Sequence, residues 1–367
     1  MENKVERNHG IDFLRIVSMF FIIILHTLGQ GGVIRNTLTS TVQFKYVWFL
    51  ETVAFVAVDI FAIISGYVSY TEKEKKVNYA NYIRIWFEVV FYNLLLCTVF
   101  KLIKPEIVTF KDYLAGLLPV TSNLYWYFTA FTGLYLLMPL INKAVRNTDE
   151  LVLKKILIAI IVGFSFFDRI ANVFNTNNGY SFVWIFLLYI IGAIIKKCHI
   201  GERLKWYHIV PTILVLYIIS LLYKIYGFSG RGINVEITKN LLISYVSPTI
   251  LISSILYVIW FSKMKFNKTF TNIIKFAAPA SFSIYLINNN KFIWATIMKD
   301  RFISLANMPI YKIYYITIGF SILFVIACIL IDNIRIYLFK KCKINNLAEI
   351  LSTGFNIIVE YFAEIIR

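Results

Sequence analysis

Apolar residues in this chain come in blocks long enough to cross a membrane as helices. Most blocks hold roughly 18 to 25 residues, the length that a helix rising about 1.5 Å per residue needs to cross about 30 Å of hydrocarbon. The short alternating segments of a membrane β-barrel do not occur. We therefore predict an all-α, polytopic transmembrane bundle of about ten helices, over residues 11–28, 47–70, 84–103, 125–142, 155–168, 180–195, 207–226, 241–261, 276–298 and 313–331.

Two further segments are amphipathic. In residues 344–367, the apolar residues Leu347, Ile350, Phe355 and Phe362 fall near one helical face, which predicts a helix lying on the inner membrane surface. We divide the chain accordingly into a membrane domain, 1–341, and an interfacial tail, 342–367. Residues 110–119 predict a similar short helix on the outer surface. Membrane anchoring is the interpretation we favour for both, and docking of a partner is the alternative.

Composition and charge support this fold. Of the 367 residues, 59% are hydrophobic and 16% are charged, which excludes a soluble globular protein of this length. The polar start is followed by no small-residue cleavage site, so we expect an uncleaved first helix. The net charge of +17 could suggest a nucleic-acid partner. With both termini in the cytoplasm, however, most Lys and Arg residues fall in cytoplasmic segments, as membrane topology requires, and we predict no nucleic-acid binding.

Ionisable side chains inside the predicted spans mark candidate sites, because each costs roughly 2.5–3.5 kcal/mol to insert. His26 is the one histidine deep in a span; it can exchange a proton near neutral pH and act as a general base, or it can be merely structural. Arg15 lies eleven residues earlier, about 16 Å away along a helix, so the two cannot touch. Arg15 can reach lipid phosphates or bind the phosphates of a cytoplasmic substrate.

Asp59, in the second predicted span, could share the depth of His26. A carboxylate there would orient the imidazole; pairing with Lys291 or with a helix amide is the alternative. The neighbouring Ser65-Gly66 lacks the surroundings of a nucleophile and indicates close helix packing instead. The four cysteines have no metal-ligand spacing, and we predict no metal site and no disulfide framework.

Four segments, in order along the chain, resemble motifs of the acyltransferase-3 family of membrane proteins. IDFLRIVSMFFIIILH, at 11–26, resembles its R-x10-H signature, with Arg15 and His26 matched. VDIFAIISGYV at 58–68, LYWYFTAFTGLYLLMPLI at 124–141 and SFSIYLIN at 281–288 are similar to its later motifs. Two positions depart from the family pattern: Asn81 replaces the first arginine of R-x-x-R, leaving Arg84, and Asn288 replaces the histidine of Y-L-x-H.

The resemblance implies ten core helices and transfer of an acyl group, usually acetyl, from cytoplasmic acetyl-coenzyme A to a cell-surface glycan or its precursor. It suggests His26 as the catalytic base or acyl carrier, and Arg15 and Arg84 as ligands of the coenzyme phosphates. Asp59 as the partner of His26 is our own inference. Trp126 and Tyr125 could stack on the sugar of the acceptor, although an interfacial aromatic belt is the commoner reason for such residues.

Three other functions compete with this hypothesis. A transporter or flippase of a lipid-linked saccharide would have broken helices near mid-membrane. A glycan polymerase or glycosyltransferase, and a degenerate member that only binds ligands, are the others. Capsular polysaccharide, teichoic acid, peptidoglycan and a small sugar precursor all remain open as acceptors, as does the oligomeric state. The richness in Ile, Asn and Lys suits a bacterial protein, for which we expect the plasma membrane.

Overall fold

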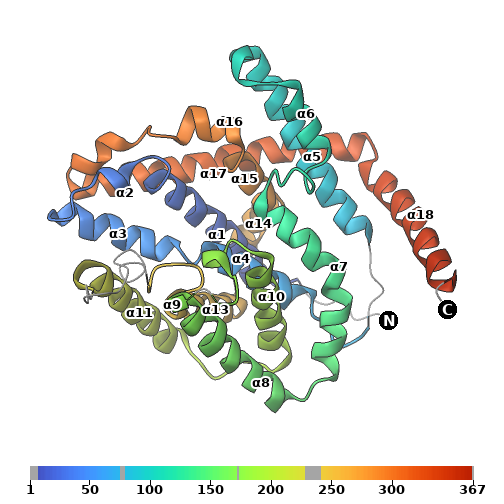
Figure 1. Cartoon of the computed structure of the whole chain (residues 1–367), viewed down its shortest axis with the longest axis horizontal. Helices are drawn as coiled ribbons and strands as arrows, with labels where there is room; N and C mark the ends of the chain where they lie inside the picture. The colour runs from blue at the N-terminus through green and yellow to red at the C-terminus, as the bar shows by residue number, and fades with distance from the viewer. Residues whose placement is uncertain (1–6, 75–78, 172, 228–240, 366–367) are drawn as a thin grey trace.

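The computed structural model describes residues 7–74, 79–171, 173–227 and 241–365, and these contain helices and no strands (Figure 1). The α-helices are α1 (His9–Leu28), α2 (Val33–Asn36), α3 (Val42–Ala54), α4 (Ala57–Ser69), α5 (Tyr79–Ile103), α6 (Phe110–Leu117), α7 (Trp126–Asn147), α8 (Glu150–Ala159), α9 (Asp168–Ala171), α10 (Phe182–Lys197), α11 (Trp206–Tyr226), α13 (Pro248–Ser262), α14 (Lys268–Ala277), α15 (Ser281–Asn288), α16 (Lys291–Ile293), α17 (Ile310–Lys341) and α18 (Ile344–Ile365). The predicted all-α class is confirmed.

Seven helical stretches in the described part of the chain are long and apolar enough to cross a membrane: His9–Asn36, Val42–Ser69, Tyr79–Ile103, Trp126–Asn147, Trp206–Tyr226, Lys268–Asn288 and Ile310–Lys341. Three other predicted spans are shorter helices. One is α8 with the π-helical turn Ile160–Phe167, and the other two are α10 and α13, of 16 and 15 residues. The helical nature of all ten segments is confirmed; ten crossings and cytoplasmic termini stay predictions.

Two predicted spans are interrupted rather than continuous. The second span is divided between α3 and α4, which meet at Phe55 and Val56. In the ninth, Pro279 lies in the 3-10 turn Ala278–Ala280, and two residues separate the end of α15 at Asn288 from the start of α16 at Lys291. Proline cannot donate a helical hydrogen bond, which explains the first of the two interruptions in this span. The second interruption places polar side chains at the end of a buried helix.

Helix α1 lies in the middle of the bundle, in contact with α3, α4, α13, α15 and α17 (Figure 1). It begins where the Asn8 side chain accepts a hydrogen bond from the Ile11 N–H at 3.1 Å, a typical N-cap. Because α1 runs through the centre, side chains near its two ends can each face a different part of the interior.

Helices α4 and α10 pack with their backbones in contact. A Cβ atom at Gly66 would lie 1.9 Å from the Tyr189 carbonyl oxygen, and one at Gly192 would lie 2.0 Å from that of Ile63. No larger residue fits either position without separating the helices, as is common for small residues between membrane helices. The prediction that Ser65-Gly66 is a packing element is confirmed for Gly66, whereas Ser65 lines a cavity.

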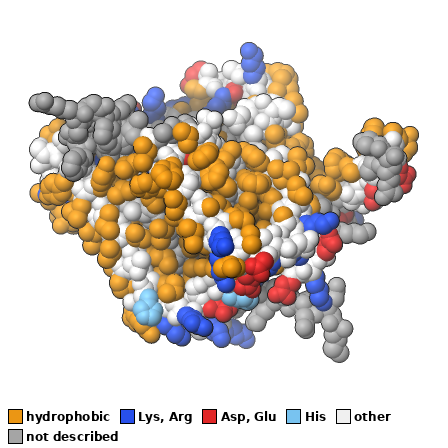
Figure 2. Space-filling view, turned by 60° about the horizontal axis from the view of Figure 1, so that its bottom comes forward, with side chains coloured by type: hydrophobic (Ala, Val, Ile, Leu, Met, Phe, Trp, Pro, Cys, Tyr) orange, Lys and Arg blue, Asp and Glu red, His pale blue; other side chains and the backbone are white. Residues whose placement is uncertain are grey.

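The molecular surface has the distribution of side chains expected in a bilayer. Figure 2 shows hydrophobic side chains over a broad area of one face, with Lys, Arg, Asp and Glu gathered toward its edges. Helix α18 extends from one edge of the bundle, with Ile350, Ile358 and Phe362 exposed (Figure 1). The predicted amphipathic helix is therefore present, and its attachment to the membrane surface stays a prediction.

Candidate functional site

Two cavities lie at opposite ends of α1, and each contains one of the two residues of the R-x10-H motif. The first, of about 250 Å³, is lined by His26; the second, of about 690 Å³, is lined by Arg15. The two sets of lining residues do not overlap. Arg15 and His26 are therefore apart, as expected, and each lines a different cavity.

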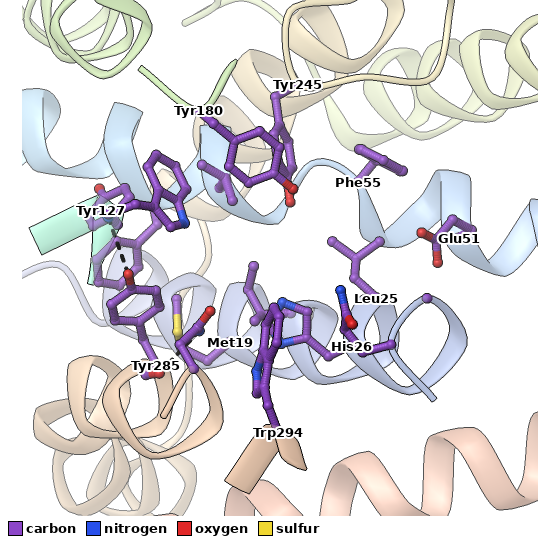
Figure 3. Close-up of a pocket in the computed structure, with 17 residues that line it drawn as sticks. Met19, Leu25, His26, Glu51, Phe55, Tyr127, Tyr180, Tyr245, Tyr285 and Trp294 are labelled. Atoms are coloured by element: carbon purple, nitrogen blue, oxygen red, sulfur yellow. Dashed lines mark hydrogen bonds between the residues drawn. The ribbon is translucent and has the colours of Figure 1, made fainter. Parts of the chain in front are cut away.

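His26 is half-buried and is held at one ring nitrogen. Its Nδ1 is hydrogen-bonded to Oδ1 of Asn288, and its ring meets that of Trp294 edge-on, with ring centroids 5.1 Å apart. With the Asn288 amide oxygen as acceptor, this bond selects the neutral tautomer that has its proton on Nδ1 and a lone pair on Nε2. Nε2 has no hydrogen-bond partner among the described residues. The imidazole can therefore accept a proton from a molecule in the cavity (Figure 3).

The expected contact between Asp59 and His26 is not formed. Asp59 is completely buried in the first turn of α4, where its Oδ1 accepts a hydrogen bond from Trp184 Nε1 at 3.0 Å. The close packing of α4 on α10, which carries Trp184, turns the carboxyl group toward that helix. Asn288, one of the two departures from the family pattern, takes the position at His26 that we expected for Asp59.

The walls of the His26 cavity are rich in aromatic residues. Figure 3 shows Tyr127, Tyr180, Tyr245 and Tyr285 around the space, and Trp126 also lines it, as its predicted role in acceptor binding requires. Glu51 of α3 contributes a carboxyl group to the same cavity. Glu51 was not among the site residues predicted from the sequence, although an acidic side chain inside the predicted second span was a detectable signal.

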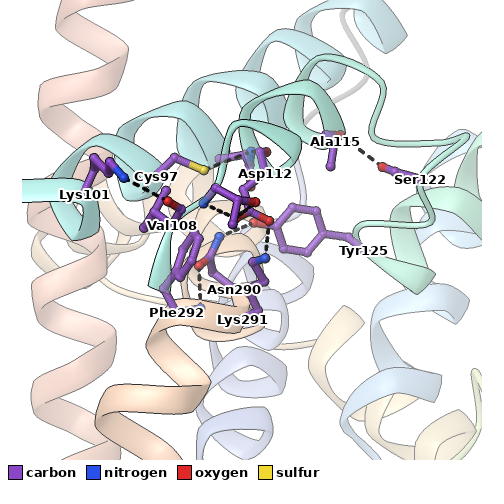
Figure 4. Close-up of polar contacts among 12 residues, drawn as sticks. Cys97, Lys101, Val108, Asp112, Ala115, Ser122, Tyr125, Asn290, Lys291 and Phe292 are labelled. Carbon is purple, nitrogen blue, oxygen red and sulfur yellow. Dashed lines mark hydrogen bonds and ion pairs between the residues drawn. The ribbon is translucent and has the colours of Figure 1, made fainter. Parts of the chain in front are cut away.

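Tyr125, the other predicted acceptor-binding residue, does not line this cavity. It is buried, and its hydroxyl accepts a hydrogen bond from Asn290 Nδ2 at 3.2 Å (Figure 4). Beside it, Lys291 is ion-paired with Asp112 of α6. Lys291 thus lies at the break after α15, with 54% of its side chain exposed, and pairs with Asp112 rather than with Asp59. This cluster fixes the short helix α6 to the broken ninth span.

The electrostatics of Asp112 favour its ionised form. Burial raises the pKa of this carboxyl group, but the hydrogen bonds from the Lys291 ammonium and from the Thr109 N–H and hydroxyl outweigh burial and lower it below its usual range. The same bonds to Thr109 form the capping box that begins α6.

The Arg15 cavity contains a second guanidinium group. Arg146, at the end of α7, lines it together with polar residues such as Asn81 and Asn142. The guanidinium groups of Arg15 and Arg146 have nearby carboxylates, Asp12 at 3.7 Å and Glu74 at 3.9 Å. Two half-buried arginines in one cavity suit an anionic ligand. Arg146 was not among the site residues predicted from the sequence.

Arg84 lies next to this cavity but does not line it. Its Nη1 donates to Asn81 Oδ1 at 2.6 Å, and its Nη2 is ion-paired with Glu349 of α18. Asn81, the other departure from the family pattern, therefore stands between Arg84 and the cavity. The predicted pair of Arg15 and Arg84 is not brought together; the structure places Arg146 in the cavity with Arg15.

Tyr127 separates the two cavities. Its ring lines the His26 cavity, 5.7 Å from the ring of Phe61, and its buried hydroxyl lies next to Ser65, which lines the Arg15 cavity. Tyr127 therefore lies between residues that line the two cavities.

Glu88, a further acidic residue of the predicted spans, belongs to a separate buried network. It accepts a hydrogen bond from Ser283 at 2.6 Å and lies 3.7 Å from Arg335, which also pairs with Asp332. The charged groups and the hydroxyl of this network pair with one another, which indicates that the network has a structural role and joins α5, α15 and α17. Among the described residues, no group of three or more His, Cys, Asp and Glu side chains could hold a metal ion.

Comparison with known proteins gives one match. A family model described as an acyltransferase domain, acyltransferase-3, matches residues 8–340, nearly the whole chain. The match includes His26, Arg15, Arg146 and Asn288, and it ends before α18. No curated protein and no solved structure matches the chain.

Proposed function

The chain belongs to the acyltransferase-3 family, and from this we propose that it moves an acetyl group from cytoplasmic acetyl-coenzyme A to a hydroxyl of a cell-surface glycan or its precursor. A membrane acyltransferase follows from the family together with the apolar helices. The donor, the acceptor, the plasma membrane as the location and the roles of individual residues are parts of the proposal.

The observation that carries the proposal is the imidazole of His26 in an aromatic cavity, with Nδ1 held by Asn288 and Nε2 unoccupied. In the reaction, the acceptor hydroxyl gives its proton to Nε2 while its oxygen attacks the thioester carbonyl carbon. The carbon–sulfur bond then breaks, the imidazolium returns the proton to the departing sulfur, and the products are an ester and free coenzyme A. The alternative, in which Nε2 itself carries the acetyl group briefly, uses the same geometry.

The Arg15 cavity supplies the site for the donor. Its two guanidinium groups, from Arg15 and Arg146, match the phosphates of coenzyme A in charge and can bind them in a bidentate manner. Its volume of about 690 Å³ lies in the range of cofactor pockets, about 300–1,000 Å³. The acetyl end of the donor would then pass Tyr127 to meet His26.

A transporter would need a broken helix in mid-membrane, and the break after Asn288 is such a feature. The residue that ends this helix holds the imidazole, however, which favours a catalytic use of the break.

The test is the acetyl content of cell-surface glycans, measured by NMR in a strain that lacks the gene and in strains restored with wild type, His26→Ala or His208→Ala. His208 is exposed on α11, away from both cavities, and is the matched control. We expect one acetyl signal to disappear with the gene and to return with wild type and His208→Ala but not with His26→Ala. Glycans that change in amount with unchanged acetylation would support transport or polymerisation instead.

A further inference from the structure

Glu51 is a buried carboxyl group that the catalytic proposal does not use. Only 6% of this residue is exposed, and its carboxyl group lines the His26 cavity, as Figure 3 shows. Oε2 is enclosed and without a hydrogen-bond partner, and Oε1 accepts none from any residue that the structure describes. A buried polar group without a partner is costly, so a ligand that donates a hydrogen bond here would be stabilised.

Among the described residues, none forms an ion pair or a hydrogen bond with this carboxyl group. Lys224 interacts with it electrostatically, and the Lys224 ammonium lies over the ring of Trp48 at 3.7 Å from the centroid. Lys224 does not line the cavity. The side of the carboxyl group that faces the cavity can therefore form a hydrogen bond with a ligand.

The remaining lining of the cavity determines which charges it can accept. Its polar side chains are His26, Gln30, Glu51, Asn289 and tyrosine hydroxyls, with no Lys or Arg among the lining residues that the structure describes. An anionic group would lose its water here and would find no Lys or Arg among the described lining residues to replace it. Hydroxyl and ammonium groups would instead find a hydrogen-bond acceptor in Glu51 and aromatic faces around them.

The two cavities differ in the charges that line them. Two arginines and one carboxylate, Glu74, line the Arg15 cavity, whereas the described lining of the His26 cavity has the Glu51 carboxyl group and no Lys or Arg. The His26 cavity is also small, about 250 Å³, below the roughly 300 Å³ at which pockets for drug-sized ligands begin. A single sugar unit fits this volume better than a longer segment of chain.

We propose that Glu51 binds the acceptor, and that the sugar unit entering this cavity is uncharged or carries an ammonium group, not a carboxylate or a phosphate. This inference rests on the proposed function, in which the His26 cavity is the acceptor site. It favours neutral and amino sugars among the acceptors left open by the sequence and disfavours phosphodiester polymers such as teichoic acid.

The test uses binding, so that it does not depend on acyl transfer. Trp126 and Trp294 line the cavity, and their fluorescence in the purified full-length protein should report its occupation. The probes are methyl glucoside, methyl glucosaminide and methyl glucuronide, which share one ring and differ in charge. We expect the glucuronide to bind about tenfold more weakly than the other two, the loss typical of an unfavourable buried charge contact.

Substitutions then assign the preference to Glu51. Glu51→Gln keeps the shape and one acceptor oxygen, so the glucoside should bind nearly as before while the difference between the glucosaminide and the glucuronide shrinks about tenfold. Glu51→Leu removes the acceptor and should weaken all three. Glu106→Gln, in the exposed turn Pro105–Ile107, is the control.

Equal affinity of wild type for the glucuronide and the glucoside would overturn the proposal, as would unchanged affinities in folded Glu51→Gln and Glu51→Leu proteins. Absence of saturable binding by all three sugars would overturn it as well. The two proposals can fail separately: loss of the glycan acetyl signal in the deletion strain supports acyl transfer whatever Glu51 does.

Discussion

Replacing Asn288 with alanine removes the one hydrogen bond that the described residues make to the His26 ring. Without the amide oxygen, the proton of the neutral imidazole is free to sit on either nitrogen, and the ring is free to turn. Only the tautomer with an unprotonated Nε2 can accept a proton from the acceptor. We therefore expect Asn288→Ala to impair the chemical step.

The size of the effect follows from the burial of this pair. Asn288 is completely buried, and a buried donor that loses its partner costs about 1–3 kcal/mol. Since each 1.36 kcal/mol is a factor of ten in rate, kcat should fall roughly 5- to 150-fold. The KM for acetyl-coenzyme A should not change, because Asn288 does not line the Arg15 cavity.

The assay is transfer of radiolabelled acetyl from acetyl-coenzyme A by the full-length protein in vesicles. Asn288→Asp keeps an acceptor for Nδ1 and should stay within a few-fold of wild type, whereas Asn288→Leu should behave like alanine. Ser281→Ala is the matched control, because it removes a buried hydrogen bond of 2.9 Å in the same helix without touching His26.

Wild-type kcat in Asn288→Ala and Asn288→Leu proteins, with unchanged thermal unfolding, would refute the reasoning: the imidazole would then be oriented by something other than Asn288. An equal loss in Ser281→Ala would show that the effect comes from helix α15 as a whole.

Two further predictions concern the Arg15 cavity and the Asp112 cluster. Arg146→Ala should raise the KM for acetyl-coenzyme A about tenfold with a smaller effect on kcat, and exposed Arg203→Ala should change neither; an unchanged KM would remove Arg146 from donor binding. Asp112→Asn should lower the thermal unfolding temperature at pH 7 by about 1–2 °C, since the half-exposed pair with Lys291 contributes under about 1 kcal/mol. The pKa of Asp112 is lowered in the folded protein, so this contribution is present above about pH 4 and is lost as the pH falls through the lower folded value; the difference between variant and wild type should vanish toward pH 2. A difference that grows on acidification would contradict that sign.

The fold was predictable because membrane helices leave a one-dimensional signal in the sequence. Long apolar blocks gave the helical segments, and the rise per residue placed Arg15 and His26 too far apart to touch. The pattern of apolar blocks does not determine how each helix is rotated about its axis. Asp59 could be placed at a depth near that of His26, but the Gly66 and Gly192 contacts that turn α4 toward α10 depend on the packing of two distant segments.

The candidate site shows the same limit. Asn288 looked like the loss of a functional histidine, and only the fold places its amide oxygen on the His26 ring. Arg84 matched the family pattern by position, yet Glu349, 265 residues later, pairs with it. Contacts between residues so far apart in sequence are set by the tertiary structure, which no local pattern contains.

The separation of the two cavities by Tyr127 has a consequence for the energy supply of the cell. If the Arg15 cavity and the His26 cavity were connected, water and ions could pass through the protein. Such an open passage would dissipate the proton and ion gradients across the membrane. The aromatic ring of Tyr127 lies between Ser65 and the His26 cavity, and we expect it to close this passage to water and ions. Under the proposed function, an acyl group would pass this ring while hydrated ions are held back, and the reaction would not dissipate these gradients.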